Sequence, residues 1–357
     1  MFGVEGFYAK EFRKIFYIRS MMNATEYTQL KNELAGVKKA AIIPHRNPDG
    51  DAMGSTLGLY FFLKQLDIEA TVVAPNDFPE FLAWLPGADH TVIYENDPSK
   101  GNAVLEQADV IFTLDFNAFH RTGDLMGAKL ASLDTDFVMI DHHELPDAYA
   151  KFMYSDPKMS STCEMVYHFI CNLGYADLLN KDIATCIYTG IVTDTGSFRF
   201  PNTTAVTHKV VSHLVELGVA CDFVFTNLYS NSTYSRLQLL GKALQNLVLL
   251  PELNASYITL SQDELNMFNH IKGDTEGIVN YGLSIKGVNL TAIFIENKLE
   301  NIIKISFRSQ GDVDVNKFAR KYFNGGGHIN AAGGKSLVSL EETVATFVRV
   351  LNEEKQS

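Results

Sequence analysis

The feature that most constrains the fold is a series of short apolar runs separated by helical patterns. In the first part of the chain these runs occupy residues 39–44, 70–74, 110–114 and 137–140. Their length is typical of strands that are buried on both faces of a sheet. Apolar residues recur at helical spacing elsewhere in this region, at 52–66, 122–133, 161–173, 181–192 and 205–217. The alternation predicts an α/β domain with a doubly wound parallel sheet and helices on both faces.

The pattern changes near residue 230. The polar segment 227–234 leads into an apolar helical pattern at 237–250, which we interpret as a helical connector. Strand-like runs follow at 255–260, 290–296 and 301–307, and helical patterns at 315–323 and 340–351. These features predict a smaller C-terminal α+β domain. A chain of 357 residues exceeds one ordinary core, so we expect two domains, at 23–228 and 251–357, joined by a linker helix at 229–250.

The charge is unevenly distributed along the chain. Before Arg236 there are 17 Lys and Arg against 29 Asp and Glu, and from Arg236 onward there are 13 of each, so the first part carries the whole net charge of -12. This balance excludes a long basic groove for duplex nucleic acid but permits a pocket for a few nucleotides. No apolar run reaches the ~18–20 residues that a membrane span needs, so we expect no membrane partner.

The cysteines and the N-terminal segment bear on the cellular compartment. The four cysteines are Cys163, Cys171, Cys186 and Cys221. They form no C-x-x-C pair and lie mostly in helical patterns, so we expect buried, reduced thiols. Residues 2–19 mix basic and aromatic side chains without a continuous apolar region or a cleavage site, which argues against a signal peptide, and Met21 and Met22 are candidate natural starts. We therefore expect a cytoplasmic protein.

Aspartate and histidine residues recur where the predicted strands end. They are His45, Asp49 and Asp51 after the first run, Asp115 after the third, and Asp141, His142 and His143 after the fourth. A further aspartate, Asp194, follows the helical pattern at 181–192. In an open parallel sheet, functional residues gather outside the carboxyl ends of the strands, so we expect the first three groups to converge.

The types of these residues favour divalent metal ions. Carboxylates and imidazoles without thiolates suit Mn²⁺, Mg²⁺, Fe²⁺ or Co²⁺ better than a structural zinc site. The set exceeds the needs of one ion, whereas two ions about 3.5–4 Å apart would use it, and such pairs drive phosphoester hydrolysis. Pro48 and Gly50 are expected to shape a turn in which Gly50 takes a positive φ, so that Asp49 and Asp51 point at neighbouring ions.

Each of these groups has an ordinary structural explanation when it is taken alone. A histidine or an aspartate after a strand is more often a helix cap, a turn residue or a hydrogen-bonded strand end. Four groups that all stand at the expected ends of strands or helices favour a functional site over that explanation.

The motifs resemble those of the DHH phosphoesterase superfamily. They are H-x-x-P-D-G-D at 45–51, a strand-terminal Asp115, D-H-H at 141–143, T-D-T-G at 193–196, and G-G-G-H-x-x-A-A-G at 325–333. The last motif is similar to the signature of the DHH-associated substrate domain. The resemblance covers roughly residues 39–336, and in size and domain pairing the chain looks most like the nanoRNase/pAp phosphatase group, which is also labelled exopolyphosphatase-related.

The resemblance implies a role for each residue of the acidic and histidine groups. His45 and Asp49 would hold one ion, and Asp51, His142 and Asp194 the other. Asp115 would bridge the two ions, which are expected to be Mn²⁺, with Mg²⁺ or Co²⁺ as alternatives. Asp141 would orient an imidazole, and His143 would face the substrate phosphate. The catalytic group implied in this way is Asp115, Asp141 and His143.

A second set of residues is expected to bind the phosphate end of the substrate. Gly325, Gly326 and Gly327 allow the backbone to approach a ligand closely and to present N–H groups, and His328 adds an imidazole donor. Arg308 ends a predicted strand and can hold a phosphate bidentately. The resemblance places all five in the nucleotide pocket. Two single arginines, Arg121 and Arg199, lie close behind motif residues and are weaker candidates for phosphate contacts.

The resemblance implies a metal-dependent hydrolase that degrades short oligoribonucleotides (nanoRNA) and dephosphorylates pAp, with two metal ions activating water. Cleavage of cyclic di-AMP or its linear product pApA is an alternative that the sequence does not separate from it. Pyrophosphate or polyphosphate hydrolysis is more distant, because the relevant family lacks the G-G-G-H loop. A nucleotide sensor without catalysis would not need the complete metal set. The oligomeric state, a homodimer included, stays open, and the active site is expected in a cleft between the two domains.

Overall fold

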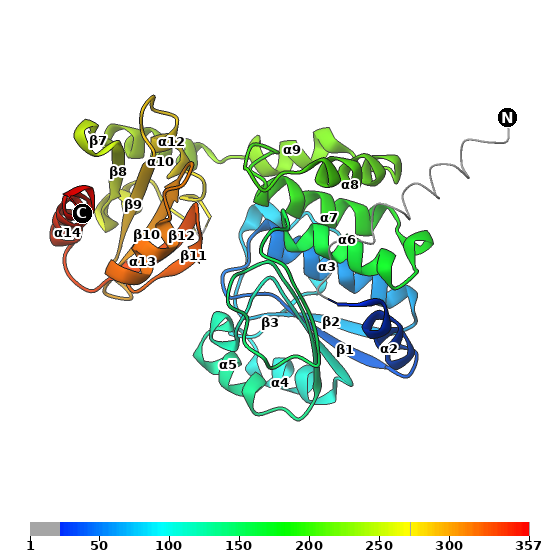
Figure 1. Cartoon of the computed structure of the whole chain (residues 1–357). Coiled ribbons are helices and arrows are strands. Elements are labelled where there is room, and N and C mark those ends of the chain that lie inside the picture. Colours follow the sequence, from blue (N-terminus) through cyan, green and yellow to red (C-terminus); the bar gives the residue numbers. More distant parts are fainter. Residues whose placement is uncertain (1–21, 272, 357) are drawn as a thin grey trace, which may run out of the picture. The chain divides into compact units, whose positions relative to one another are not determined.

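The computed structural model describes residues 22–271 and 273–356 and divides between Ser230 and Asn231 into two units. Figure 1 shows the course of the chain through these units. Residues 2–19 and Met21, considered above in relation to a signal peptide and a natural start, lie outside the described residues.

The first unit contains a six-stranded sheet in the order β3-β2-β1-β4-β5-β6, and every pairing in it is parallel. Its strands are β1 (Lys39–Ile43), β2 (Glu69–Ala74), β3 (Val92–Ile93), β4 (Val110–Leu114), β5 (Asp136–Asp141) and β6 (Phe152–Ser155). The central strand β4 is buried along its whole length, as the apolar runs predict for a sheet that is covered on both faces.

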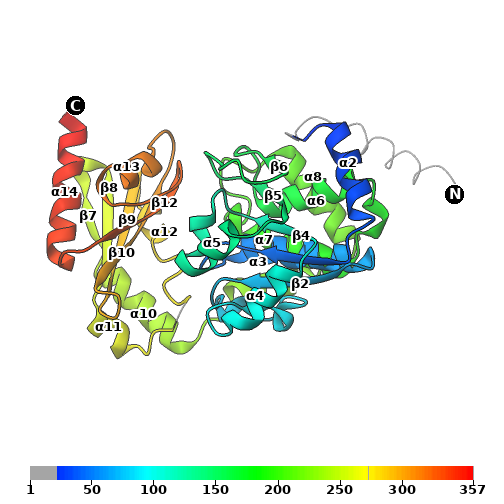
Figure 2. The ribbon, with the colours of Figure 1, turned by 90° about the horizontal axis from the view of Figure 1, so that it is seen from below.

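Helices cover both faces of this sheet, which confirms the predicted doubly wound α/β fold (Figures 1 and 2). One hydrophobic core contains residues of α2 (Ala24–Leu34), α3 (Gly50–Gln65), α6 (Thr162–Asn172), α7 (Lys181–Asp194), α8 (Ala205–Glu216) and α9 (Cys221–Tyr229). The core on the other face contains residues of α4 (Pro98–Gln107) and α5 (Asp124–Ala131).

The close packing of α3 against α7 brings the start of one helix beside the end of the other. A Cβ atom on Gly54 would lie 2.5 Å from the Cys186 carbonyl oxygen, and one on Gly190 would lie 3.0 Å from Asp51 Cα. Only residues without a side chain allow this approach, since interiors are packed without spare volume. Glycine in these two helices therefore serves the contact that positions Asp51 near Asp194.

The second unit is built on a mixed six-stranded sheet in the order β11-β12-β10-β9-β8-β7, in which only β8 and β9 pair in parallel. Its strands are β7 (Val248–Leu250), β8 (Ala255–Leu260), β9 (Leu290–Asn297), β10 (Ile302–Ser309), β11 (Gly326–His328) and β12 (Ala331–Ser336). Its helices are α10 (Tyr234–Gln245), α11 (Gln262–Met267), α12 (Asn280–Leu283), α13 (Val315–Tyr322) and α14 (Leu340–Gln356).

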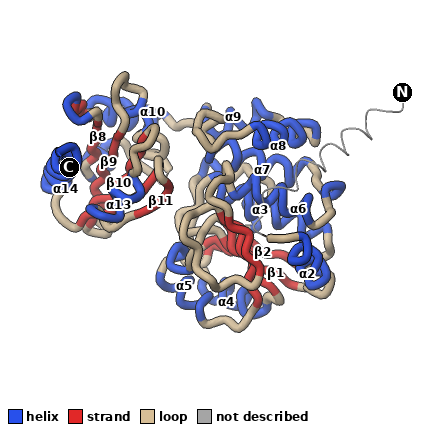
Figure 3. The backbone as a smooth tube through the Cα atoms, viewed as in Figure 1, coloured by secondary structure: helices blue, strands red, loops and turns tan. Residues whose placement is uncertain are grey.

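Two cores fill the second unit, one on each face of its sheet. One core contains residues of α13 and α14, and the other contains residues of α10 and α11. Figure 3 shows the helices (blue) beside the strands (red) in each unit. The predicted C-terminal α+β architecture is confirmed.

The segment that we interpreted as a linker helix at 229–250 differs in structure from that prediction. Helix α10 ends at Gln245, and residues Val248–Leu250 form strand β7, which pairs antiparallel with β8. Leu239 and Ala243 are fully buried in a core of the second unit. The apolar periodicity of this segment therefore reflects burial within that unit, and its last residues are strand because they extend the sheet edge.

Several short elements were not predicted from the sequence. They are strands β3, β6, β7, β11 and β12, helices α2, α4, α9, α11 and α12, and the 3-10 helices η2 (Glu80–Leu82), η3 (Ala88–His90), η4 (Phe119–Thr122), η5 (Ala176–Leu178) and η6 (Pro251–Leu253). Most of these elements are too short for hydrophobic periodicity to identify them.

Within residues 22–271 and 273–356, no single helix is both long and apolar enough to cross a membrane. Helices α8 and α9 meet that requirement only as a pair, across a bend of 110°. The cysteines carry no disulfide, and Cys163 and Cys186 are buried as expected, whereas Cys171 and Cys221 are only partly buried.

Candidate metal centre

The predicted acidic and histidine groups come from adjacent elements of the first unit. Strands β1, β4 and β5 are neighbours in the sheet, and their carboxyl ends lead into His45, Asp115 and the Asp141–His143 segment. Two helix ends supply the other carboxylates: Asp49 and Asp51 lie at the start of α3, and Asp194 is the last residue of α7. The convergence follows from the parallel sheet, whose strand ends share one edge.

Asp115 lies at the centre of this group. Its Oδ2 atom is 3.4 Å from His45 Nε2, and its Oδ1 atom is 3.4 Å from His142 Nε2. The backbone of Asp115 has a φ of 63°, a left-handed conformation that aspartate tolerates better than most residues. The residue is 2 % exposed, so its carboxylate is buried between the two imidazoles.

The remaining carboxylates approach the same two imidazoles. His142 Nε2 lies 3.8 Å from Asp51 Oδ2 and 3.6 Å from Asp194 Oδ2. His45 Nε2 lies 3.9 Å from Asp49 Oδ2. Each imidazole therefore lies near Asp115 and also near at least one further aspartate that the other imidazole does not share.

Among the described residues of the first unit, Asp115, Asp141 and His143 have ligand atoms within 4.8 Å of one another. Two further sets with this spacing consist of predicted metal ligands alone. One set is His45, Asp49 and Asp115, and the other is Asp51, Asp115 and His142, and within each set the ligand atoms all lie within 4.8 Å of one another. Asp115 belongs to both sets. This arrangement can hold two ions with one shared carboxylate, which is the geometry of dinuclear hydrolytic sites.

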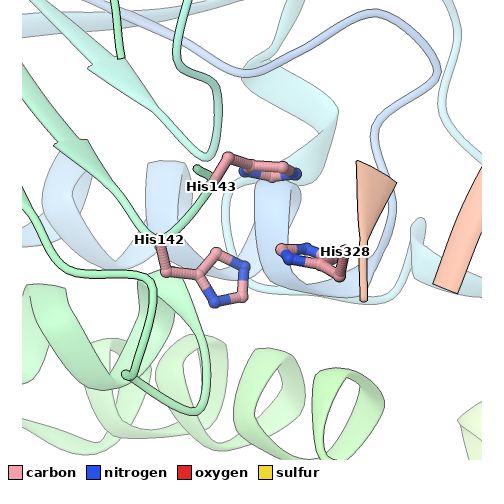
Figure 4. Close-up of side chains that lie close together, drawn as sticks. All are labelled: His142, His143 and His328. Carbon is pink, nitrogen blue, oxygen red and sulfur yellow. The ribbon is translucent and has the colours of Figure 1, made fainter. Parts of the chain in front are cut away.

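His142 and His143 leave the end of β5 with their rings nearly perpendicular, at 84° and with centroids 5.2 Å apart (Figure 4). His143 Nδ1 is 2.7 Å from Asp141 Oδ1, and His143 Nε2 is 3.5 Å from Arg121 Nη2. Asp141 is fully buried, and its Oδ2 atom has no hydrogen-bond partner among the described residues. The carboxylate of Asp141 therefore orients the ring of His143.

The loop between β1 and α3 is held by a pair of asparagines. Asn47 has a φ of 56°, its backbone N–H donates to Asn76 Oδ1 at 2.7 Å, and Asn76 Nδ2 donates to Asn47 Oδ1 at 2.8 Å. Asn76 is buried and lies just after β2. This reciprocal pair fixes the turn that separates His45 from Asp49.

The expectation for Gly50 was wrong. Gly50 has no positive φ and is the first residue of α3, and the positive φ of this loop falls on Asn47. A Cβ atom on Gly50 would lie 2.5 Å from Thr193 Oγ1, so glycine is required here by the close approach of α7. Asp49 caps α3 by accepting from the N–H groups of Asp51 and Ala52.

The electrostatics of the centre reflect an excess of buried negative charge. Burial and the neighbouring Asp115 and Asp194 carboxylates raise the pKa of Asp51 well above its usual range. Burial alone would raise the pKa of Asp115, but hydrogen bonds to His142 and His45 outweigh it and hold that pKa well below its usual range. For His142, burial would lower the pKa, but the carboxylates of Asp194 and Asp115 raise it well above the ordinary value.

This charge distribution fits divalent cations. Four aspartates face only two imidazoles in the two sets, counting Asp194 beside His142. Buried carboxylates are stable when they are paired or when they bind a metal ion. Oxygen and imidazole donors without thiolate are the ligands of Mn²⁺, Mg²⁺ and Fe²⁺ sites.

The first turn of α6 is part of the centre, although it was not among the residues predicted from the sequence. The backbone N–H groups of Thr162 and Cys163 donate to the two oxygens of Asp51, at 2.6 and 2.8 Å, and Thr162 Oγ1 donates to Asp115 Oδ1 at 3.0 Å. The only sequence signal was Ser161 three residues before Glu164, which indicates a helix start. That signal identifies a cap but not its neighbours in space.

The predicted phosphate-binding residues lie together at one end of the second unit's sheet. Arg308 on β10 pairs with Ala331 on β12, and Ala331 pairs with His328 on β11. Paired residues share a face of the sheet, so Arg308 and His328 flank a small alanine on one face, with backbones about 10 Å apart. Arg199, by contrast, donates from Nε to the Gly196 carbonyl.

The glycines before His328 form a hairpin. Gly326 and Gly327 belong to β11, and the N–H groups of Gly325 and Gly327 donate to Ala319 O and Asn316 Oδ1. These two amides therefore donate hydrogen bonds within the second unit, in contrast to the expectation that they are presented to a ligand. A Cβ atom on Gly325 would lie 1.9 Å from the Gly333 carbonyl, which explains glycine at that position.

Comparison with known proteins assigns both units to described domains. Residues 39–191 match the N-terminal domain of the DHH family, and residues 259–356 match the DHHA1 domain. The bifunctional oligoribonuclease and PAP phosphatase NrnA of Bacillus subtilis is 33% identical over 84% of this chain and 90% of its own. A crystal structure of an exopolyphosphatase-related protein from Bacteroides fragilis is 38% identical, covers 94% of this chain and 98% of its own, and superimposes with a TM-score of 0.89.

More distant relatives have other activities in their names. The cyclic-di-AMP phosphodiesterase GdpP of Bacillus subtilis is 24% identical over 91% of this chain and 49% of its own. A probable manganese-dependent inorganic pyrophosphatase of Streptococcus mutans is 26% identical over 63% of this chain and 71% of its own. The two domain matches and the identity to NrnA over most of both chains agree with the motifs and the geometry of the centre. The chain therefore belongs to the DHH phosphoesterase superfamily.

Proposed function

We propose that this protein is a metal-dependent phosphoesterase that hydrolyses short oligoribonucleotides and removes phosphate from pAp. The observation that carries the proposal is the pair of ligand sets that share Asp115. It is supported by the similarity to NrnA along most of both chains, whereas the similarity to the cyclic-di-AMP phosphodiesterase is lower.

In this proposal, His45 and Asp49 hold one ion, Asp51, His142 and Asp194 hold the other, and Asp115 contacts both. Divalent ions bound there supply positive charge for the phosphoryl oxygens and lower the pKa of water to a range useful at neutral pH. Mn²⁺ suits the mixed imidazole and carboxylate set, and a relative is named manganese-dependent.

His143 and Arg121 are proposed to contact the reacting phosphate. Asp141 engages His143 Nδ1, so the Nε2 side of the ring, beside Arg121, is the part directed away from that carboxylate. An imidazole and a guanidinium at this place donate hydrogen bonds to phosphate oxygens and stabilise the charge that develops during hydrolysis. A planar guanidinium also selects for the oxygens of a phosphate by its geometry.

We further propose that residues 23–228 carry the catalytic metal centre and residues 251–357 bind the substrate. Arg308 and His328 are the proposed substrate-binding residues of the second unit, and Gly325, Gly326 and Gly327 are proposed to contribute as the close-packed hairpin that carries His328. The shared face of Arg308 and His328 supports this role, because a guanidinium and an imidazole there can hold one phosphate group.

The test is a substrate panel. Protein loaded with Mn²⁺ or with Mg²⁺ is incubated with labelled RNA dinucleotides and with pAp, and mononucleotide and phosphate release are measured. We expect both products, and Asp115→Asn should abolish both. A fully metal-loaded protein that releases neither product would refute the proposal.

The second candidate function is hydrolysis of cyclic di-AMP or of its linear product. The relative GdpP favours it, although that protein is about twice as long as the part matched here. Rates on cyclic di-AMP, pApA and pAp measured side by side separate the two functions. A pAp rate below that on cyclic di-AMP would favour the second candidate.

A further inference from the structure

The first turn of α6 contacts two of the proposed metal ligands at once. Thr162, the first residue of the helix, donates its hydroxyl to Asp115 Oδ1 at 3.0 Å and its backbone N–H to Asp51 Oδ2 at 2.6 Å. Cys163 adds a second backbone N–H to Asp51 Oδ1 at 2.8 Å. Thr162 is completely buried, so these contacts are made away from solvent.

The hydroxyl of Thr162 differs from the two imidazoles among the proposed metal ligands, His45 and His142, in whether it can still donate to Asp115 when a metal ion binds. Nε2 of His45 and of His142 is the atom nearest to Asp115 in each case. An imidazole nitrogen that ligates a metal ion must give its lone pair to the ion and carries no proton. It can then no longer donate a hydrogen bond to Asp115. The Thr162 hydroxyl is no metal ligand in either set, so it keeps its hydrogen bond to the carboxylate.

The turn itself is anchored by a buried carboxylate that the metal sets do not include. Glu164 is 2 % exposed, and its Oε2 atom accepts hydrogen bonds from the hydroxyl of Ser160 and from that of Thr207, the latter at 2.8 Å. Asn202 donates to the Ser160 carbonyl at 2.8 Å. The turn is thereby tied to α8 and to the segment that precedes it, so Thr162 is also held by contacts that do not involve the metal ligands.

We propose that Thr162 is a positioning residue that holds the shared carboxylate Asp115 in its metal-binding orientation through its hydroxyl group. This inference rests on the proposed function only in taking Asp115 as a ligand of both ions. Partners that orient a metal ligand without touching the metal typically contribute 10–100-fold in metal affinity or activity. Loss of the hydroxyl should therefore weaken metal binding, while the backbone N–H bonds to Asp51 remain.

Two pairs of variants isolate the hydroxyl. The first pair is the parent protein and Thr162→Val, whose side chains at position 162 have nearly the same shape and differ in the hydroxyl. The second pair is Thr162→Ser and Thr162→Ala, which differ in the hydroxyl on a smaller side chain. Mn²⁺ affinity is measured by calorimetry and by the spin resonance signal of free Mn²⁺, without substrate. We expect the Val variant to bind at least one ion about 10–100-fold more weakly than the parent, and the Ala variant to bind more weakly than the Ser variant by a similar factor.

A matched control is Thr189→Val. Thr189 is also completely buried in a helix, and its hydroxyl donates to the Thr185 carbonyl at 2.8 Å. We expect this variant to keep the Mn²⁺ affinity of the parent. If Thr162→Val does not fold, the comparison of the Ser and Ala variants still decides the question.

Equal Mn²⁺ affinity within both pairs would overturn the inference, and so would a Ser variant that binds as weakly as the Ala variant. The outcome is separate from that of the proposed function, because no substrate is present in the binding measurement. A hydroxyl-dependent Mn²⁺ affinity in a protein that hydrolyses neither oligoribonucleotides nor pAp would uphold the inference and refute the proposed function.

Discussion

At the scale of single residues, the candidate centre depends on Asp115. One carboxylate faces both imidazoles, is held by the Thr162 hydroxyl and sits on a left-handed backbone at the end of β4. No other described side chain belongs to both the His45 set and the His142 set. Substitutions here should thus affect metal binding before they affect folding.

We predict that Asp115→Asn lowers hydrolysis by roughly 1,000-fold or more, because an amide cannot serve as a charged bridging ligand and several kcal/mol of charge stabilisation are lost. Metal content after desalting, measured by mass spectrometry, should fall with it. Asp109→Asn is the control, since Asp109 accepts only backbone N–H groups of Lys38 and Lys39 among the contacts seen and lies at the other end of β4. Full metal content in Asp115→Asn would contradict the assignment.

We predict that Arg121→Gln lowers kcat/KM by roughly 10- to 100-fold, because a hydrogen bond to a charged group contributes about 1.5–3 kcal/mol. Arg121→Lys should recover only part of the loss, since lysine keeps the charge without the planar fork. Steady-state kinetics on pAp and on a dinucleotide measure the effect. Mn²⁺ affinity should stay unchanged in both variants, and a large loss of Mn²⁺ would show that Arg121 acts on the centre instead of the substrate.

At the scale of secondary-structure elements, the contact of α3, α6 and α7 sets the distance between the carboxylates. A Cβ atom on Gly190 would meet Cys163 Sγ at 2.2 Å and Asp51 Oδ1 at 2.8 Å. Asp51 is thus enclosed by α6 and α7 at once. The packing of these helices therefore also determines the geometry of the proposed metal ligands.

We predict that Gly190→Ala lowers the free energy of unfolding by about 1–3 kcal/mol, because overpacking forces the helices apart, and that it lowers metal affinity as well. Chemical denaturation measures the first effect. The control is Gly241→Ala in α10, where the new Cβ meets no described atom within 4 Å apart from the helix's own backbone and the two adjacent residues. That variant should be more stable by about 0.4–1 kcal/mol, since alanine favours a helix interior. Equal stability of the two variants would contradict this account.

The contribution of Glu164, which anchors the first turn of α6, to the free energy of unfolding should depend on pH in the acidic range. Burial would raise the pKa of Glu164, but hydrogen bonds from His168, Ser160 and Thr207 outweigh it and hold that pKa below the ordinary value of a glutamate, 4.5. A lowered pKa means that the ionised form is favoured in the folded state, so its contribution to stability is present above pH 4.5 and is lost as the pH falls through the folded-state pKa.

We therefore predict that Glu164→Gln unfolds more easily than the parent at pH 7 and that the difference shrinks as the pH falls below 4.5. Urea denaturation of both proteins between pH 7 and pH 3 measures this difference. A difference that grows toward low pH would have the wrong sign for this explanation.

At the scale of the whole molecule, each unit has cores of its own. Two cores lie within the residues before Ser230 and two within those after Asn231. The proposed metal ligands all belong to the first unit. Metal ions should therefore stabilise that unit specifically.

We predict that removal of divalent ions by a chelator increases hydrogen exchange in the first unit, above all at the starts of α3 and α6, and leaves the cores of the second unit unchanged. A ligand at 100 times its Kd stabilises the state that binds it by about 2.7 kcal/mol, which is enough to change exchange rates by roughly 100-fold. Mass spectrometry of peptides measures both units in one experiment. Equal loss of protection in the two units would contradict the assignment of the ions to the first unit.

Much of the fold could be predicted from the sequence, because the buried strands are contiguous apolar runs. The runs at 39–44, 110–114 and 255–260 match β1, β4 and β8 within one residue at each end. Short elements such as β11 and β12 were missed, since a glycine-rich hairpin has no apolar period. The end of α10 and the strand β7 were also missed, because burial in either element requires the same apolar residues.

The sequence by itself determined which chemistry is available. Aspartates and histidines at the ends of apolar runs specify both the ligand types and the sheet edge where they meet, because strands in a parallel sheet share that edge. Only the tertiary structure decided how these ligands are held. The hydroxyl of Thr162 on Asp115, the backbone N–H groups on Asp51, and the contact that requires glycine at position 50 join residues that are 47 to more than 140 positions apart. Such contacts depend on how α3, α6 and α7 pack, and no local pattern in the sequence encodes that packing.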